Sequence, residues 1–227
     1  MKVSGIFTVR NAIEAGYPFV ESILSVKPAV DEFLVNDGGS DDGTLDVLMA
    51  MEDEYDKIEL HQIDDFKSEN WECIDHQISE LIDRCSGDWI FESQADEIYH
   101  EDDIREILQL IQKCDEVGYN SIRQPRESIT AKSNEIGAYT YHTVRIVRNL
   151  PDLETHWGGD DFRIGAPGTS KYSSHHVPPE YESTIPFYHY NRAFEEQSDE
   201  NKRRHAEWLA TQHHGRQESY TETSNDN

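Results

Sequence analysis

The chain is poor in cations and has no long apolar run, and each shortage excludes a class of protein. Eight lysines and twelve arginines stand against 46 acidic residues, so the net charge of the 227 residues is −26. No basic stripe is present that could follow a phosphate backbone, and we therefore expect no nucleic-acid partner. The apolar runs are at most about five residues long, whereas a membrane-spanning helix needs roughly 20, so we expect no transmembrane segment.

Cysteine is also scarce. Cys73, Cys85 and Cys114 have a spacing that matches no zinc or redox motif, which favours small buried hydrophobic residues in a reducing cytosol. The first residues lead directly into a strand-like sequence and lack the apolar core and cleavage site of a signal peptide. We therefore expect a soluble, cytoplasmic protein that is at most peripheral to a membrane.

The acidic residues are dispersed from Glu14 to Asp226 and do not form a tail. A dispersed acidic surface with few lysines fits a cytoplasm of high salt concentration, where ions screen the self-repulsion of the chain. We therefore expect a halophilic source, either an archaeon or a virus. An acidic protein from an ordinary cytosol is the alternative.

The first 115 residues alternate between strand-like and helix-like patterns. We expect strands at residues 2–9, 32–36, 58–63 and 89–91, each followed by a stretch with apolar residues at helical spacing. Such alternation predicts an α/β fold with a mainly parallel sheet flanked by helices. Right-handed crossovers place the carboxyl ends of the strands at one edge of the sheet, where ligands bind. The loops 36–44 and 92–100 leave that edge.

The second half of the chain has a weaker pattern. We expect strands near 119–123 and 138–148, an irregular region rich in Gly, Pro and His, and a helix at 195–212. The polar segment 212–227 lacks aliphatic residues, and we expect it to be disordered. We interpret 1–211 as one domain, with a binding half at 1–115 and an irregular acceptor-side half at 116–211.

Two polar segments follow predicted strands. In Asn36-Asp37-Gly38-Gly39-Ser40-Asp41-Asp42-Gly43-Thr44, Asp37 ends a buried strand and the glycines permit a tight turn. Its carboxylate could accept hydrogen bonds from a nucleobase N–H or a ribose hydroxyl, while an ordinary acidic turn explains the segment equally well. The second segment is Gly87-Asp88-Trp89-Ile90-Phe91-Glu92-Ser93-Gln94-Ala95-Asp96-Glu97.

Together these segments resemble the V-D-D-G-S-x-D-x-T turn and the G-D-W-I-L-x-L-D-A-D-E segment of the family 2 glycosyltransferases. The resemblance implies the GT-A fold and a donor site at Asp37, Gly38, Gln94 and Ala95. It also implies Mg²⁺ or Mn²⁺ on the donor diphosphate, held by the D-x-D element.

The D-x-D element departs from the family pattern at its first position. That aspartate is Gln94 here, a poor metal ligand, so Asp96 is the expected one. We interpret Glu97 as a cap of the next helix, and a role beside the metal is the alternative.

Further donor contacts are expected at the end of the first strand. Similar enzymes place a V-x-N stretch against the base and ribose, which implies Thr8, Arg10 and Asn11. A solvent-facing Arg10 beside a helix-capping Asn11 is the alternative.

Two later segments resemble a subgroup related to lipopolysaccharide-core enzymes. Residues 139–149 resemble R-L-F-R-N and imply that Arg145 or Arg148 contacts phosphate oxygens, with salt bridges to carboxylates as the alternative. Residues 186–192 resemble I-Y-H-Y-x-x-x-R and imply His189 as a further metal ligand, with packing among its aromatic neighbours as the alternative.

The catalytic base is expected downstream of the metal segment. Asp161 and Asp160 are the candidates, Glu154 is a third, and an acidic loop without catalytic function is the alternative. The resemblance implies inverting transfer of a sugar from a nucleotide-diphospho-sugar, with UDP-sugar as the default, to a hydroxyl of a glycan, lipid-linked or protein acceptor. A degenerate nucleotide-sugar-binding protein is the main alternative. A nucleotidyltransferase is less favoured, since no Gly-rich loop with a lysine follows the first strand.

Overall fold

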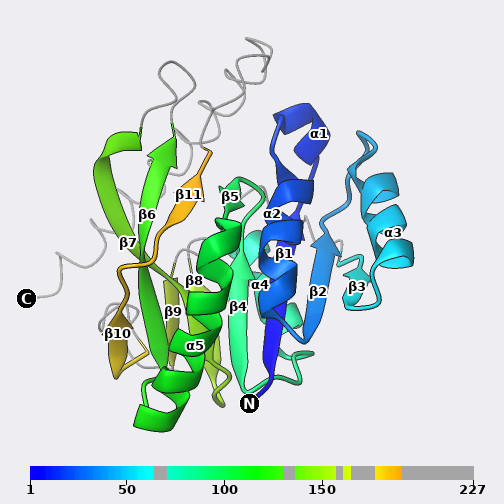
Figure 1. The fold of residues 1–227 in the computed structure, drawn as a ribbon. Coiled ribbons are helices and arrows are strands. Elements are labelled where there is room, and N and C mark those ends of the chain that lie inside the picture. Colours follow the sequence, from blue (N-terminus) through cyan, green and yellow to red (C-terminus); the bar gives the residue numbers. More distant parts are fainter. Residues whose placement is uncertain (64–70, 130–135, 157–160, 165–176, 191–227) are drawn as a thin grey trace, which may run out of the picture.

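The structure is a computed structural model that describes residues 1–63, 71–129, 136–156, 161–164 and 177–190 (Figure 1). The helices are α1 (Ala12–Ala15), α2 (Phe19–Val26), the 3₁₀ helix η1 (Lys27–Ala29), α3 (Thr44–Glu54), α4 (Trp71–Ile82) and α5 (Glu101–Val117). The strands are β1 (Val3–Val9), β2 (Glu32–Asp37), β3 (Ile58–His61), β4 (Trp89–Ser93), β5 (Glu97–Ile98), β6 (Ser121–Ile129), β7 (Ile136–Arg148), β8 (Leu153–His156), β9 (Asp161–Ile164), β10 (Glu180–Glu182) and β11 (Phe187–His189).

One large mixed sheet organises the molecule. Its strand order is β3-β2-β1-β4-β7-β6-β11-β5, with β10 beside β6. The strands β3, β2, β1 and β4 are mutually parallel, whereas β7 runs antiparallel to both β4 and β6. The predicted α/β fold is therefore confirmed. The chain places β2 and β3 on one side of β1 and β4 on the other, so the strand order switches between β1 and β4, where ligands bind in such sheets.

Both faces of the sheet are covered, so successive side chains along a central strand enter two different cores and nearly all of them are buried. Phe7 of β1 points into a core shared with α2 and α5, while its neighbour Ile6 points into a second core with α4. Figure 1 shows α2 and α5 in front of the sheet and α4 behind it. The run of apolar and small residues along β1, without exposed polar positions, is thus the sequence signature of a strand that is buried on both faces.

Helix α5 shows how the ends of an element are set. Its buried stripe is Ile104, Ile107, Ile111 and Cys114. His100 occupies the N-cap position, and its ring accepts a hydrogen bond from the backbone N–H of Asp102 at 3.2 Å. The prediction that Glu97 caps this helix is wrong, because Glu97 is fully buried in β5, three residues before the cap.

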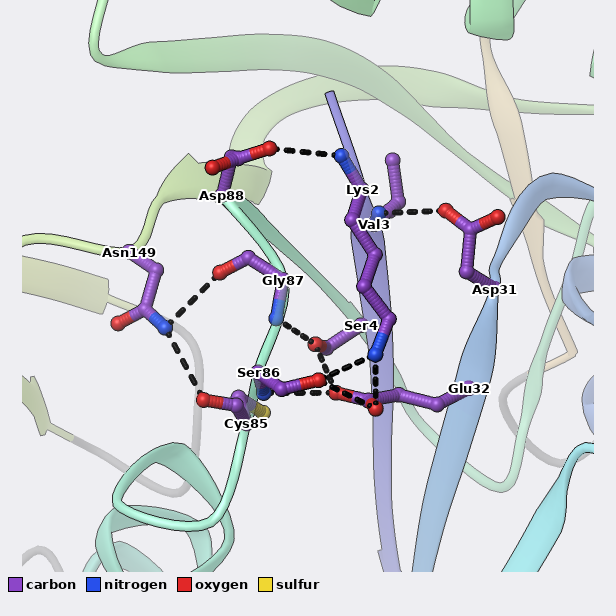
Figure 2. A network of polar contacts seen from close by, with 10 residues as sticks. All are labelled: Lys2, Val3, Ser4, Asp31, Glu32, Cys85, Ser86, Gly87, Asp88 and Asn149. Carbon is purple, nitrogen blue, oxygen red and sulfur yellow. Dashed lines mark hydrogen bonds and ion pairs between the residues drawn. The ribbon is translucent and has the colours of Figure 1, made fainter.

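The amino edge of the sheet is held by a polar network around Glu32 (Figure 2). Its carboxylate accepts hydrogen bonds from Nζ of Lys2 at 2.6 Å and from Oγ of Ser4 at 2.6 Å. It also accepts from the backbone N–H and the hydroxyl of Ser86, both at 2.7 Å. These contacts join β2, β1 and the loop that enters β4, so one side chain fixes the start of three neighbouring strands.

The remaining predictions concern the cysteines, membrane-spanning helices and the carboxyl-terminal region. Cys73, Cys85 and Cys114 are free, and two of them are buried. Within the described residues, no helix is long and apolar enough to cross a membrane. The predicted helix at 195–212 and the tail at 212–227 lie outside the described residues, and the division of the chain near residue 115 stays a prediction.

Candidate functional site

The carboxyl ends of β1, β2 and β4 meet at one edge of the sheet. Val9 of β1 pairs in register with Asp37 of β2, and Phe7 of β1 pairs with Ser93 of β4. Both motifs found in the sequence leave the sheet at this edge, beside the point where the strand order switches. The structure therefore brings the Asp37 turn and the Gln94 turn to the two sides of β1.

Asp37 is a buried carboxylate with one unused oxygen. Its Oδ2 accepts hydrogen bonds from the backbone N–H of Gly39 at 2.9 Å and of Ser40 at 2.8 Å. Its Oδ1 has no hydrogen-bond partner, although the residue is only 1% exposed. Gly39 has a φ of 84°, which a residue with a side chain rarely adopts. An unsatisfied carboxylate oxygen costs free energy, so it marks a place for a ligand donor.

The loop after β1 is tied to this turn by side chains. Asn11 Nδ2 donates to Asp41 Oδ1 at 2.9 Å, and the backbone N–H of Asp41 donates to Asn11 Oδ1 at 2.9 Å. Asn11 stands at the N-cap position of α1, yet its side chain makes no cap hydrogen bond. Asn11 therefore holds the N-cap position of the alternative interpretation, while its side chain fixes the two loops to each other instead of capping the helix. Arg10 is exposed beside it.

Thr8 belongs to a buried polar cluster beneath the turn. Its hydroxyl donates to Gln77 Oε1 at 3.0 Å and accepts from Asn36 Nδ2 at 2.9 Å. The hydroxyl of this predicted donor-binding residue is thus already engaged within the fold. Gln77, on α4, was missed in the sequence analysis, and its Nε2 has no hydrogen-bond partner. Its position in an apolar helix stripe gave no signal that it would meet β1 and β2.

The turn that carries Gln94 and Ala95 is fixed by helix α2. The hydroxyl of Ser22 donates to the carbonyl oxygen of Gln94 at 2.7 Å. The same carbonyl accepts the backbone N–H of Glu97 at 3.1 Å, which closes the turn. Gln94 and Ala95 are both half-buried, so the predicted donor-binding residues lie at the rim of the sheet edge.

Asp96 and His189 are brought together by strand pairing. β11 runs antiparallel to β5, and the backbone N–H of Tyr190 donates to the carbonyl oxygen of Asp96 at 2.7 Å. Nε2 of His189 lies 3.2 Å from Oδ2 of Asp96, and both side chains are largely buried. Burial favours the protonated form of Asp96, but the hydrogen bond from His189 and the positive charges of His189 and Arg126 outweigh it and lower the pKa of the carboxyl.

Arg126 is a third member of this cluster, and sequence reasoning missed it. Its Nη2 lies 3.2 Å from Nε2 of His189. The residue is on β6, in register with Phe187 of the adjacent β11. The predicted strand ended at Arg123, so the sequence offered no reason to place Arg126 beside the second motif.

Arg145 does not lie at the donor site. It is fully buried, and its Nε and Nη2 donate to the two carboxylate oxygens of Glu97 at 2.7 Å each. Nη1 lies 3.1 Å from Oε2 of Glu92. The salt-bridge alternative therefore describes Arg145, because Glu97 and Glu92 already occupy its guanidinium nitrogens. Its pairing with Glu97 also explains why Glu97 does not cap α5.

The metal site implied by the family resemblance can be tested against these side chains. Gln94 supplies an amide where a carboxylate is expected, and Asp96 is the one carboxylate left, already beside Arg126 and His189. In the part of the chain that the structure describes, no group of three His, Cys, Asp or Glu side chains is placed to hold a metal ion. Mg²⁺ and Mn²⁺ prefer oxygen ligands with uncompensated negative charge, so these residues fit a divalent cation poorly.

Two of the candidate bases, Asp161 and Glu154, are on a small two-stranded sheet and not on a strand of the large sheet. Asp161 begins β9, which pairs with β8 in a separate two-stranded sheet. Glu154, on β8, is exposed. Asp160 lies outside the described residues. The choice of base therefore stays a prediction.

The chain is thus an α/β protein in which the acidic turn and Asp96 of the buried Asp96–His189 pair both follow strands of one large sheet. Residues 6–157 match the family described as Glycosyl transferase family 2. This match includes more than half of the chain, and the chain therefore belongs to glycosyl transferase family 2. No curated protein matches the chain.

Solved structures give a more distant likeness. S. aureus TarS 1-349 has 15% identity and a TM-score of 0.46, over 59% of this chain and 38% of that chain. The same TarS segment in complex with UDP has 15% identity and a TM-score of 0.45, over 66% and 47%. The mannosyltransferase PcManGT from Pyrobaculum calidifontis, in complex with GDP-Man and Mn²⁺, has 14% identity and a TM-score of 0.42, over 54% and 35%. The chain thus spans less than half the length of each.

Proposed function

We propose that this protein transfers a sugar from a nucleotide-diphospho-sugar to an acceptor hydroxyl. The observation that carries the proposal is the buried Oδ1 of Asp37, which has no partner and stands at the sheet edge of a family 2 domain. An N–H of a base or a ribose hydroxyl would satisfy this oxygen. The proposed donor site is completed by residues in the loops that follow β1, β2 and β4. These residues are Arg10, Asn11, Gly38, Gln94 and Ala95.

The proposed reaction is a single displacement at the anomeric carbon. The acceptor oxygen forms a bond to that carbon while the bond to the diphosphate oxygen breaks, and the electron pair leaves with the nucleoside diphosphate. The acceptor proton passes to a carboxylate, for which Asp161 is preferred to Asp160. One displacement inverts the configuration of the sugar. UDP-sugars are the default donors, and the acceptor hydroxyl belongs to a glycan, a lipid-linked sugar or a protein.

The Mg²⁺ or Mn²⁺ that the family resemblance implies would be held by Asp96 and His189 and would neutralise the departing diphosphate. As described above, these residues fit such an ion poorly, and no step of the proposed reaction is routed through it. We further propose a cytoplasmic location, at most peripheral to a membrane, in a high-salt environment, on the ground of the net charge of −26.

The proposal is tested by measuring release of nucleoside diphosphate from a panel of UDP- and GDP-sugars in molar salt. We expect release with at least one donor, and a large loss of nucleotide affinity in Asp37→Asn. Asp46→Asn is the matched control. Asp46 is an exposed residue of α3, and its substitution removes the same charge as Asp37→Asn. Tight binding without release would favour the degenerate binding protein, and neither binding nor release would overturn the proposed site.

A further inference from the structure

The proposed transfer step creates negative charge at one place. Cleavage of the bond between the anomeric carbon and the diphosphate leaves an extra negative charge on the terminal phosphate oxygen. Enzymes lower this barrier by placing cations or hydrogen-bond donors where the charge develops. The question for this chain is which group supplies them, because the Gln94–Asp96 turn is poorly suited to hold a metal ion.

The Asp96–His189–Arg126 cluster has an excess of basic groups over carboxylates. The guanidinium Nη2 of Arg126 lies 3.2 Å from His189 Nε2, which in turn lies 3.2 Å from Asp96 Oδ2. The charge of Arg126 offsets that of Asp96, so little negative charge remains to attract a dication. The same arrangement places the planar guanidinium of Arg126 at the sheet edge, and its parallel N–H groups are suited to bind phosphate oxygens.

His189 adds a second, independent observation. The residue is 4% exposed, and its Nδ1 has no hydrogen-bond partner. Buried polar atoms are nearly always satisfied in folded proteins, and an exception calls for an explanation. A ligand oxygen that enters beside Asp96 would provide the missing partner. Arg126 is half-buried, so it retains surface that a ligand can reach, in contrast to the fully buried Arg145.

We infer that Arg126 and His189 stabilise the departing nucleoside diphosphate directly and perform the task that a divalent metal ion performs on a D-x-D element. Asp96 holds His189 in place and is a positioning residue. This inference rests on the proposed function and goes beyond it, because it predicts sugar transfer without a metal ion. Replacement of the first D-x-D carboxylate by Gln94 is then a consequence of the exchange of metal for arginine.

The first test is donor turnover by the full chain, after treatment with EDTA and again after addition of Mn²⁺. We expect the same rate of nucleoside diphosphate release in both. Arg126→Gln should lower kcat by about 10²- to 10³-fold, the usual effect of removing one donor to a developing charge. Arg126→Lys should keep part of the rate. Loss of activity with EDTA and its recovery with Mn²⁺ would overturn the inference while the proposed function stands.

The second test is binding of UDP and GDP by calorimetry, which does not depend on turnover. We expect an affinity that EDTA leaves unchanged and that Arg126→Gln weakens. Arg123→Gln is the matched control, because Arg123 is on the same strand and bonds Glu180 at 2.7 Å, outside the cluster. Equal affinities of Arg126→Gln, Arg126→Lys and wild type, in variants shown to be folded by circular dichroism, would overturn the inference. A wild-type chain that neither binds nor releases nucleotide would overturn the proposed function with it.

Discussion

Glu32 offers the clearest test of how the amino edge of the sheet is stabilised (Figure 2). Burial raises the pKa of its carboxyl, but hydrogen bonds from Lys2, Ser4 and Ser86 outweigh burial, and the pKa falls from 4.5 to about 2. The perturbation is Glu32→Gln, which keeps the size of the side chain and removes its charge. The amide can accept hydrogen bonds at one oxygen only, so the network around Ser4 and Ser86 loses part of its contacts.

The magnitude follows from the shift in pKa. A difference of 2.5 between 4.5 and about 2 corresponds to about 3 kcal/mol of folding free energy, at about 1.4 kcal/mol per unit. Because the folded pKa is the lower one, this stabilisation is complete above pH 4.5. It is lost as the pH falls from 4.5 towards about 2, where the folded form also becomes protonated. The Glu32 side chain is 26% exposed, so molar salt will reduce the value.

The assay is urea unfolding followed by tryptophan fluorescence, at constant salt and at several pH values between 7 and 3. We expect Glu32→Gln to lower the free energy of unfolding at pH 7 by up to about 3 kcal/mol, with a smaller deficit at pH 3. Glu59→Gln is the control, because Glu59 is on neighbouring β3 with a side chain that is 70% exposed. It removes the same charge from a very acidic chain. Equal effects of the two variants, or a deficit that does not shrink with pH, would refute the reasoning.

Three further predictions concern packing and coupling. Gly5→Ala should lower the thermal midpoint and cost roughly 1–3 kcal/mol, because its Cβ would stand 2.5 Å from Cδ2 of the buried Phe33 ring; an unchanged midpoint would contradict this. Arg145→Met should lower the free energy of unfolding in urea by about 3–5 kcal/mol, because it leaves the buried carboxylates of Glu97 and Glu92 without a positive partner. A loss no larger than that of Arg123→Met would count against the buried pairing. A double-mutant cycle of Asn11→Ala and Asp41→Ala should give a coupling of roughly 1 kcal/mol, and simple additivity would argue against the paired loops.

The first half of the fold could be predicted because its signal is local. Along β1, Ile6 and Phe7 face opposite cores, and the resulting run of apolar and small residues is visible within a short stretch of sequence. The helices between the strands carry apolar stripes of equally short range. When strands and helices alternate, right-handed crossovers make the strands parallel. The turns that carry Asp37 and Gln94 then follow strands that end at the same edge of the sheet.

The second half of the fold and the surroundings of Asp96 depend on contacts between residues that are far apart in the sequence. A short stretch of sequence does not reveal such contacts. β5 pairs with β11, which joins Asp96 to Tyr190 across the chain. The partner of Arg145 is Glu97, so the charge pattern around either residue could not show that both are buried. For the same reason Glu97 resembled a helix cap, and Arg126 lay beyond the end of the predicted strand. The residues that sequence reasoning misplaced or missed here, Glu97, Arg145 and Arg126, are therefore those whose surroundings are set by long-range strand pairing.

Polar side chains of the proposed site differ in hydrogen bonding from Glu32 at the amino edge of the sheet. At the amino edge, Glu32 accepts four hydrogen bonds within the chain. Near the carboxyl edge, Asp37 Oδ1, Gln77 Nε2 and His189 Nδ1 are buried without a partner. A buried polar atom without a partner costs stability, and a bound ligand that supplies the partner restores it. Nucleotide binding should therefore raise the thermal midpoint of this protein by more than it raises that of Asp37→Asn, measured at the same nucleotide concentration.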